Sequence, residues 1–173
     1  MELKLRQDVI KLVSDGGIGI ELGVAEGVFS ERILTLNKLS YLYSVDMYAG
    51  DRGHDILQYS RAVKRLMPYR NNNTILKMKF EEALHLFDNE YFDFIYIDGY
   101  AHTGQDSGKT LNDWFPKLKK GGIFSGDDYS SQWPKVIEEV DKFVLKNNLE
   151  LYIIECSEPN SIWSEQPTWW IKK

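Results

Sequence analysis

The sequence predicts an α/β fold in which one open, largely parallel sheet carries helices on both faces. Short apolar runs rich in β-branched and aromatic residues alternate with helical patterns along the chain, and this alternation is typical of parallel βαβ units. The tail departs from it, because two apolar stretches flank a turn at Pro167, which indicates a closing antiparallel strand. With 173 residues, no repeat and no internal linker, the chain is expected to form a single domain, 1–173.

Each element is expected from its own local pattern. Leu5, Val9 and Val13 recur at helical spacing, so the chain should open with a short amphipathic helix. The apolar runs that follow predict strands, and the segments between them predict helices. The longest irregular segment is 47–73, and loops of that length tend to be functional. Strands are expected at 18–22, 41–45, 75–78, 92–97, 122–125, 149–155, 162–163 and 168–171, and helices at 30–38, 81–87, 105–118 and 134–146.

Composition excludes several classes of protein. The formal net charge of −5 argues against a general nucleic-acid-binding surface. Cys156 is the single cysteine, so an internal disulfide is impossible and a reducing compartment fits. The N-terminus lacks the apolar core of a signal peptide, and no stretch approaches the roughly 20 apolar residues of a membrane span. We therefore expect a cytoplasmic protein that does not enter a membrane.

The segment IGIELGVAEG at 18–27 predicts a strand that runs into a ligand-binding turn. Gly23 and Gly27 permit a tight turn and close approach of a ligand to the backbone. Glu21 stands where a dinucleotide fingerprint requires glycine, and a carboxylate there suits an ammonium group rather than a pyrophosphate. Asp46 ends the next strand, where an acidic side chain can bind ribose hydroxyls. The expected ligand has a ribose and an amine, which describes S-adenosylmethionine better than NAD; the alternative is an ordinary strand–turn–helix junction.

Three carboxylates follow two later strands. Asp98 ends the fourth strand, and Asp127 and Asp128 end the fifth. Because neighbouring parallel strands end at one edge of a sheet, the three side chains can converge there. Hard oxygen ligands favour Mg²⁺, which would bind and orient an acceptor hydroxyl. The alternative is that Asp98 touches cofactor or solvent and the adjacent pair caps a turn.

Four segments together resemble one family: ELGVAEG, the acidic SVDMY, FDFIYIDG with a following His, and WFPKLKKGGIFSGDDYS. They are similar to class I S-adenosylmethionine-dependent methyltransferases, and most of all to the metal-dependent O-methyltransferases of the macrolide-sugar and catechol type. The resemblance covers roughly residues 17–130. It implies a Rossmann-like sheet of seven strands whose last strand is antiparallel.

The resemblance also implies roles for individual residues. The metal-dependent relatives hold their ion at the positions of Asp98, Asp127 and Asp128. The implied cofactor contacts are Glu21, Gly23 and Gly27 for the methionine part, Asp46 for the ribose, Phe80 and Glu81 beside the adenine, and Asp98 at the end of the fourth strand.

His102 is the expected general base, because its ordinary pKa lies near neutrality. In the related pattern a His follows IDG after one residue, whereas Tyr100 and Ala101 intervene in this sequence. Gly104 and Thr110 also depart from the pattern, which usually has an aromatic residue and an Asp there. The alternative is a loop histidine near the cofactor without a role in proton transfer.

The short N-terminus bears on the acceptor. Only 17 residues precede the first strand, so the N-terminal helical lid of the catechol-type relatives is missing. The site must then be closed by residues 47–73, by a neighbouring subunit of a homo-oligomer, or by a bulky acceptor such as a sugar rather than a small phenol. Two other classes stay open: a non-catalytic cofactor-binding protein, and a nucleic-acid methyltransferase that uses the six basic residues of segment 61–79.

Overall fold

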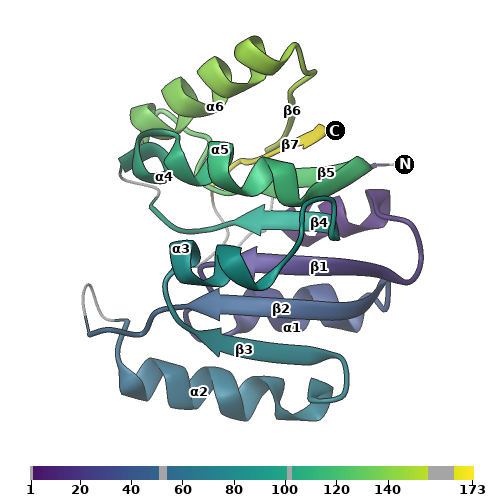
Figure 1. Ribbon diagram of the computed structural model, residues 1–173, viewed down its shortest axis with the longest axis vertical. Helices are drawn as coiled ribbons and strands as arrows, with labels where there is room; N and C mark the ends of the chain where they lie inside the picture. Colours follow the sequence, from purple (N-terminus) through teal and green to yellow (C-terminus); the bar gives the residue numbers. More distant parts are fainter. Residues whose placement is uncertain (1, 51–53, 101–102, 156–165) are drawn as a thin grey trace.

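The computed structural model describes residues 2–50, 54–100, 103–155 and 166–173, and seven strands among them form one sheet (Figure 1). The strand order is β3-β2-β1-β4-β5-β7-β6. Strands β1 to β5 run parallel, whereas β7 lies antiparallel to both β5 and β6, which confirms the predicted Rossmann-like sheet. The strands are β1 (Gly17–Leu22), β2 (Leu39–Asp46), β3 (Asn73–Lys77), β4 (Phe92–Ile97), β5 (Leu118–Gly126), β6 (Tyr152–Ile154) and β7 (Thr168–Lys172).

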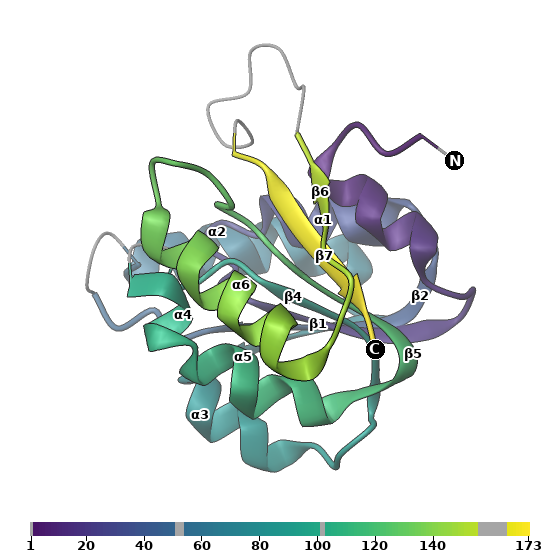
Figure 2. The same ribbon diagram turned by 90° about the horizontal axis from the view of Figure 1, so that it is seen from above.

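Helices cover both faces of the sheet, as Figure 2 shows from above. One face carries the N-terminal 3₁₀ helix η1 together with α1 and α2, and the other carries α3, α5 and α6. In the described part of the chain, no helix is long and apolar enough to cross a bilayer. The helices are η1 (Arg6–Leu12), α1 (Val28–Thr35), α2 (Ile56–Leu66), η2 (Met67–Tyr69), α3 (Phe80–Ala83), η3 (Leu84–Leu86), α4 (Gly104–Ser107), α5 (Lys109–Trp114), η5 (Phe115–Lys117) and α6 (Pro134–Asn147).

The sheet separates two apolar cores. Along β4, Phe94 and Tyr96 pack towards η1 and α1, whereas Ile95 and Ile97 pack towards α5 and α6. Successive side chains of a strand point to opposite faces, so a strand buried on both sides is apolar throughout. This continuous burial holds the strand ends rigidly, and the candidate site is built on those ends.

Several sequence expectations need correction. Segment 47–73 is not irregular throughout, because it contains α2, whose first turn is capped by the Asp55 carboxylate through the N–H groups of Leu57 and Gln58. The helix expected at 105–118 is divided into α4, α5 and η5, with a left-handed backbone at Gly108. The strand expected at 162–163 lies outside the described residues.

Candidate functional site

The predicted site residues gather at the carboxyl ends of the central strands. Glu21 is the last residue but one of β1, and Asp46 ends β2. Asp98 directly follows β4, and Asp127 directly follows β5. Strand β1 lies between β2 and β4, and its following helix covers the opposite face from the helices that follow β4. This reversal is the point at which open α/β sheets bind ligands.

Asp46 holds the loop that follows β1. Its Oδ2 atom accepts hydrogen bonds from the backbone N–H groups of Val24 and Ala25, both at 3.0 Å, and its Oδ1 atom accepts one from Tyr48 at 3.2 Å. Burial opposes the charge, but hydrogen bonds from His54 and from these N–H groups keep the pKa of Asp46 below its usual value. The carboxylate expected to bind ribose is thus also the anchor of the predicted cofactor loop.

Gly23 is required by the packing of this loop against β4. Its φ is +100°, and a Cβ atom there would lie 2.3 Å from the carbonyl oxygen of Asp98. Any other residue would force the loop away from the strand end. The glycine spacing that predicted a close backbone approach therefore reflects a contact inside the protein.

Glu21 is buried, with 1% of its surface exposed. The Ser30 hydroxyl donates to its carboxylate, Ser30 lies 3.1 Å from Ser44, and the Asn73 side-chain amide donates to Ser44 at 2.9 Å. Burial raises the pKa of Glu21 to about 8. A ligand ammonium group beside this carboxylate would favour its ionised form.

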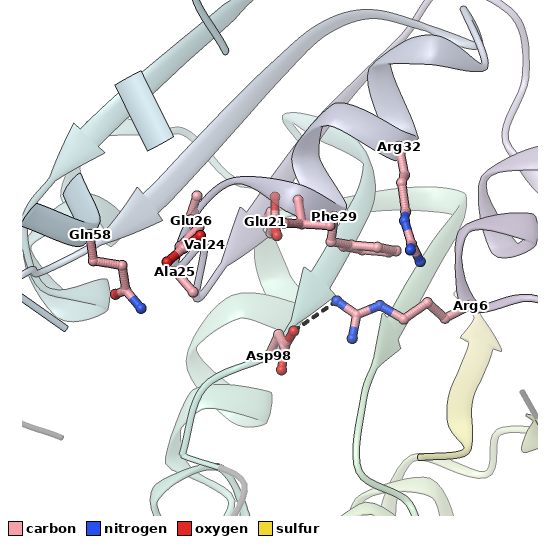
Figure 3. A pocket seen from close by; sticks show the side chains of 10 residues that line it. Arg6, Glu21, Val24, Ala25, Glu26, Phe29, Arg32, Gln58 and Asp98 are labelled. Atoms are coloured by element: carbon pink, nitrogen blue, oxygen red, sulfur yellow. Dashed lines mark hydrogen bonds and ion pairs between the residues drawn. The ribbon is translucent and has the colours of Figure 1, made fainter. Parts of the chain in front are cut away.

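A pocket with an empty volume of about 570 Å³, its open mouth included, lies between η1, the loop after β1 and the beginning of α2 (Figure 3). Glu21 and Asp98 line its middle, and the side chains of Arg6, Phe29 and Arg32 lie together at one end, away from Gln58. The pocket therefore offers carboxylates at its centre and arginines at one end.

Arg6 is a site residue that the sequence analysis did not identify. Its Nη2 atom donates to Asp98 Oδ2 at 2.9 Å, and its Nη1 atom donates to Asp127 Oδ2. Only 7% of Arg6 is exposed, and its guanidinium lies 4.1 Å from the centre of the Phe29 ring. The sole sequence signal was a basic residue in an otherwise amphipathic first helix, and such a residue is normally solvated.

The expectation of Mg²⁺ at Asp98, Asp127 and Asp128 is not supported by this arrangement. One oxygen of Asp98 and one of Asp127 are bound by the guanidinium, and Asp128 is hydrogen-bonded to Trp133. Within the described residues, no three His, Cys, Asp or Glu side chains are grouped as a metal site requires. The residues as arranged do not fit a divalent cation, because an internal cation takes up the same carboxylates.

The remaining predicted residues differ in how far they can be placed. His102 lies outside the described residues, so its role as general base stays a prediction. The Phe80 ring lies beside Gly99, where an added Cβ would be 2.7 Å from it, and so forms part of the same sheet edge. Glu81 is exposed, with Lys79 3.9 Å away. The His54 Nδ1 atom lies 3.6 Å from Asp46 Oδ2.

The basic segment 61–79 is partly neutralised by its neighbours. Arg61 pairs with Glu26 at 2.7 Å, and Arg65 pairs with Glu31 at 2.8 Å. These pairs join α2 to α1 and to the loop before it. The local excess of positive charge seen in the sequence is therefore smaller on the surface of the folded protein.

Comparison with known proteins gives a family and a fold. A family model described as a methyltransferase domain matches residues 20–129. An rRNA methylase from Streptococcus thermophilus has a TM-score of 0.68 and 15% identity, with 100% of this chain and 99% of that one covered. A Streptococcus mutans protein solved in complex with S-adenosylhomocysteine (SAH) has a TM-score of 0.68 and 13% identity, covering 99% of both chains.

A third structure is an S-adenosylmethionine-dependent O-methyltransferase from Thermotoga maritima, with a TM-score of 0.68 and 16% identity, over 95% of this chain and 62% of that one. Identities this low show a shared fold, and they do not identify the substrate of this chain. No curated protein matches the sequence significantly.

Proposed function

The chain belongs to the methyltransferase domain family and is an S-adenosylmethionine-dependent methyltransferase, and from this premise we propose that it methylates a hydroxyl oxygen of a sugar or another small molecule. The observation that carries the proposal is the pocket at the carboxyl edge, with Glu21 and Asp98 in its lining. Such a pocket can hold a cationic methyl donor beside a group able to take a proton.

The cofactor half of the pocket suits the methyl donor. The buried Glu21 carboxylate is the counter-ion for the ammonium group of the methionine part. Asp46 fixes the backbone of Val24 and Ala25, and its position at the end of β2 also suits ribose hydroxyls. Phe80, beside Gly99, supplies an apolar wall for the adenine. These assignments agree with a donor that carries an amine and a ribose but no phosphate.

The transfer itself is an in-line displacement. The acceptor oxygen attacks the methyl carbon, the new C–O bond forms as the C–S bond breaks, and the electron pair of that bond returns to sulfur to give SAH. The hydroxyl proton must leave with the reaction. We assign this proton to Asp98, which is among the residues that line the pocket; His102 is the other candidate. Holding the two reactants in line lowers the barrier to this step.

A nucleic-acid acceptor is the second candidate. Segment 61–79 keeps basic side chains on the surface, among them Lys64 and Arg70, which are exposed at α2 and just after η2. The pairing of Arg61 and Arg65 with glutamates weakens this alternative. A non-catalytic cofactor-binding protein is the third, since Glu21 and Asp46 alone would suffice for binding.

The test is transfer of a labelled methyl group from S-adenosylmethionine to a panel of glycosides, phenols and RNA. The proposal expects label in a glycoside or another hydroxyl compound, with product formation reduced by Asp98→Asn. Label in RNA, with turnover that falls steeply as salt increases, would replace it with the nucleic-acid alternative. SAH binding without turnover on any acceptor would favour the non-catalytic one.

A further inference from the structure

We propose that Arg6 takes the place of a divalent cation between Asp98 and Asp127, so that the first turn of the N-terminal helix completes the acceptor half of the site and no metal ion binds there. The inference rests on the proposed function in one respect only: the part of the site formed by Asp98 and Asp127 is called the acceptor half because the acceptor is proposed to bind there. The ion-pair geometry that carries it is independent of the reaction.

The Arg6 guanidinium lies between the two carboxylates. One of its nitrogens binds a carboxylate oxygen of Asp98 and another binds one of Asp127, so a single cation bridges the ends of β4 and β5. The Arg6 and Asp127 side chains have 8% and 7% of their surface exposed, and Asp98 has 28%. A metal ion would need the same inward-facing oxygens that the arginine already binds.

Arg6 also balances the negative charge of the two carboxylates. Two carboxylates this close repel each other, and burial penalises both, so a cation is needed between them. Burial, followed by the neighbouring carboxylates, raises the pKa of Asp127 to about 8, although Arg6 acts against that rise. Arg6 itself remains charged, with its pKa held well above the usual value by the surrounding anionic groups despite burial. The chain thus supplies by itself the positive charge that a metal would otherwise bring.

Aromatic side chains hold the Arg6 guanidinium in place. The guanidinium stacks on Phe29 of α1 at 4.1 Å and lies 5.6 Å from the Tyr96 ring of β4. A planar fork that binds two carboxylates and stacks on a ring is specific to arginine, and a lysine ammonium cannot reproduce it. The Thr168 hydroxyl, 3.3 Å from Asp127 Oδ1, fixes the other oxygen of that carboxylate. These contacts hold Arg6 as a positioning residue for both acidic side chains.

The experiment measures Mn²⁺ binding to the full-length protein by electron paramagnetic resonance, in wild type, Arg6→Ala, Arg6→Gln and Asp127→Asn. The proposal expects no Mn²⁺ site in wild type that depends on Asp127. Removal of the guanidinium frees the carboxylate pair, so Mn²⁺ binding should strengthen about tenfold or more in Arg6→Ala. Adding Asp127→Asn to that variant should abolish the gain. Arg61→Ala is the matched control, because it removes an arginine whose partner, Glu26, lies outside the pair.

Each outcome of the Mn²⁺ measurement either supports or overturns the role of Arg6 as the internal cation. Wild-type Mn²⁺ binding that Asp127→Asn abolishes would overturn the proposal, and so would folded Arg6 variants that gain no affinity for the ion. If Arg6→Ala does not fold, Arg6→Gln removes the charge with less loss of volume, and the wild-type comparison with Asp127→Asn decides alone. SAH binding, recorded on the same samples, separates the two proposals: its absence would contradict the function and leave the Mn²⁺ result standing.

Discussion

The two halves of the site are both acidic, but they are neutralised in different ways. In the cofactor half, Glu21 is held by the neutral hydroxyl of Ser30, and burial raises its pKa to about 8. In the acceptor half, Asp98 and Asp127 share the guanidinium of Arg6. The cofactor half is therefore suited to a cationic ligand, whereas the acceptor half carries its own cation. The comparison predicts that the cofactor half responds most to ligand binding, and the acceptor half to loss of one arginine.

The largest effect should follow from Arg6→Ala. Removing the guanidinium leaves the buried carboxylate of Asp127 and the half-buried carboxylate of Asp98 without their partner, and breaking a buried pair typically costs about 3–5 kcal/mol in the free energy of unfolding. Urea denaturation near pH 7 would measure it. Arg61→Ala, which breaks an exposed pair, should change that free energy by less than about 1 kcal/mol. Equal losses in the two variants would show that Arg6 does not hold the acceptor half together.

The next effect concerns the loop of the cofactor half. Asp46→Ala leaves the N–H groups of Val24 and Ala25 without their acceptor, at a cost of about 1–3 kcal/mol in the free energy of unfolding. Asp46→Asn keeps one acceptor oxygen and should lose less. SAH affinity, measured by calorimetry, should fall with stability in the same order. An Asp46→Ala protein with unchanged affinity would contradict the role of Asp46 as the anchor of the loop.

Glu21→Gln should separate binding from stability. Loss of the counter-ion for a buried ammonium group should weaken SAH binding by about 30-fold or more, or ~2 kcal/mol. The pKa of Glu21 in the folded protein, about 8, lies above its ordinary value of 4.5, so ionisable Glu21 lowers stability progressively as pH rises between these values. The variant should therefore melt at a higher temperature than wild type at pH 8, as scanning calorimetry would show. A lower melting temperature together with unchanged affinity would refute this account of Glu21.

The smallest effect is a pH dependence of cofactor binding through Glu21. Below about pH 8 Glu21 is largely protonated in the ligand-free protein, and pairing with an ammonium group requires its ionised form. SAH binding at pH 7 should then release a proton and tighten as pH rises towards 8, by at most about tenfold per pH unit. Calorimetry in buffers of different ionisation enthalpy counts that proton. Proton release that persists in Glu21→Gln would assign it to another group.

The same contrast explains what the sequence could predict. Glu21, Gly23 and Asp46 belong to short strand-and-turn patterns. The hydrogen-bond partners of Asp46, Val24 and Ala25, precede it by only 22 and 21 positions in the sequence. The largely parallel sheet with helices on both faces followed from the alternation of elements and was confirmed, and the neighbouring strands β4 and β5 bring Asp98 and Asp127 to one arginine. Arg6 precedes Asp98 by 92 residues and Asp127 by 121, and no local pattern records such a contact. The expectation of a metal ion at Asp98, Asp127 and Asp128 found no support, because it did not include the distant arginine that binds two of these carboxylates.

The most direct test of this account is calorimetric titration of SAH into the wild-type protein in EDTA and again in Mg²⁺. The account predicts binding in both buffers with the same affinity and enthalpy, because the ammonium group meets Glu21 and the acceptor half is already neutralised by Arg6. Binding that requires Mg²⁺ would contradict the internal cation, and no binding in either buffer would contradict the cofactor site itself.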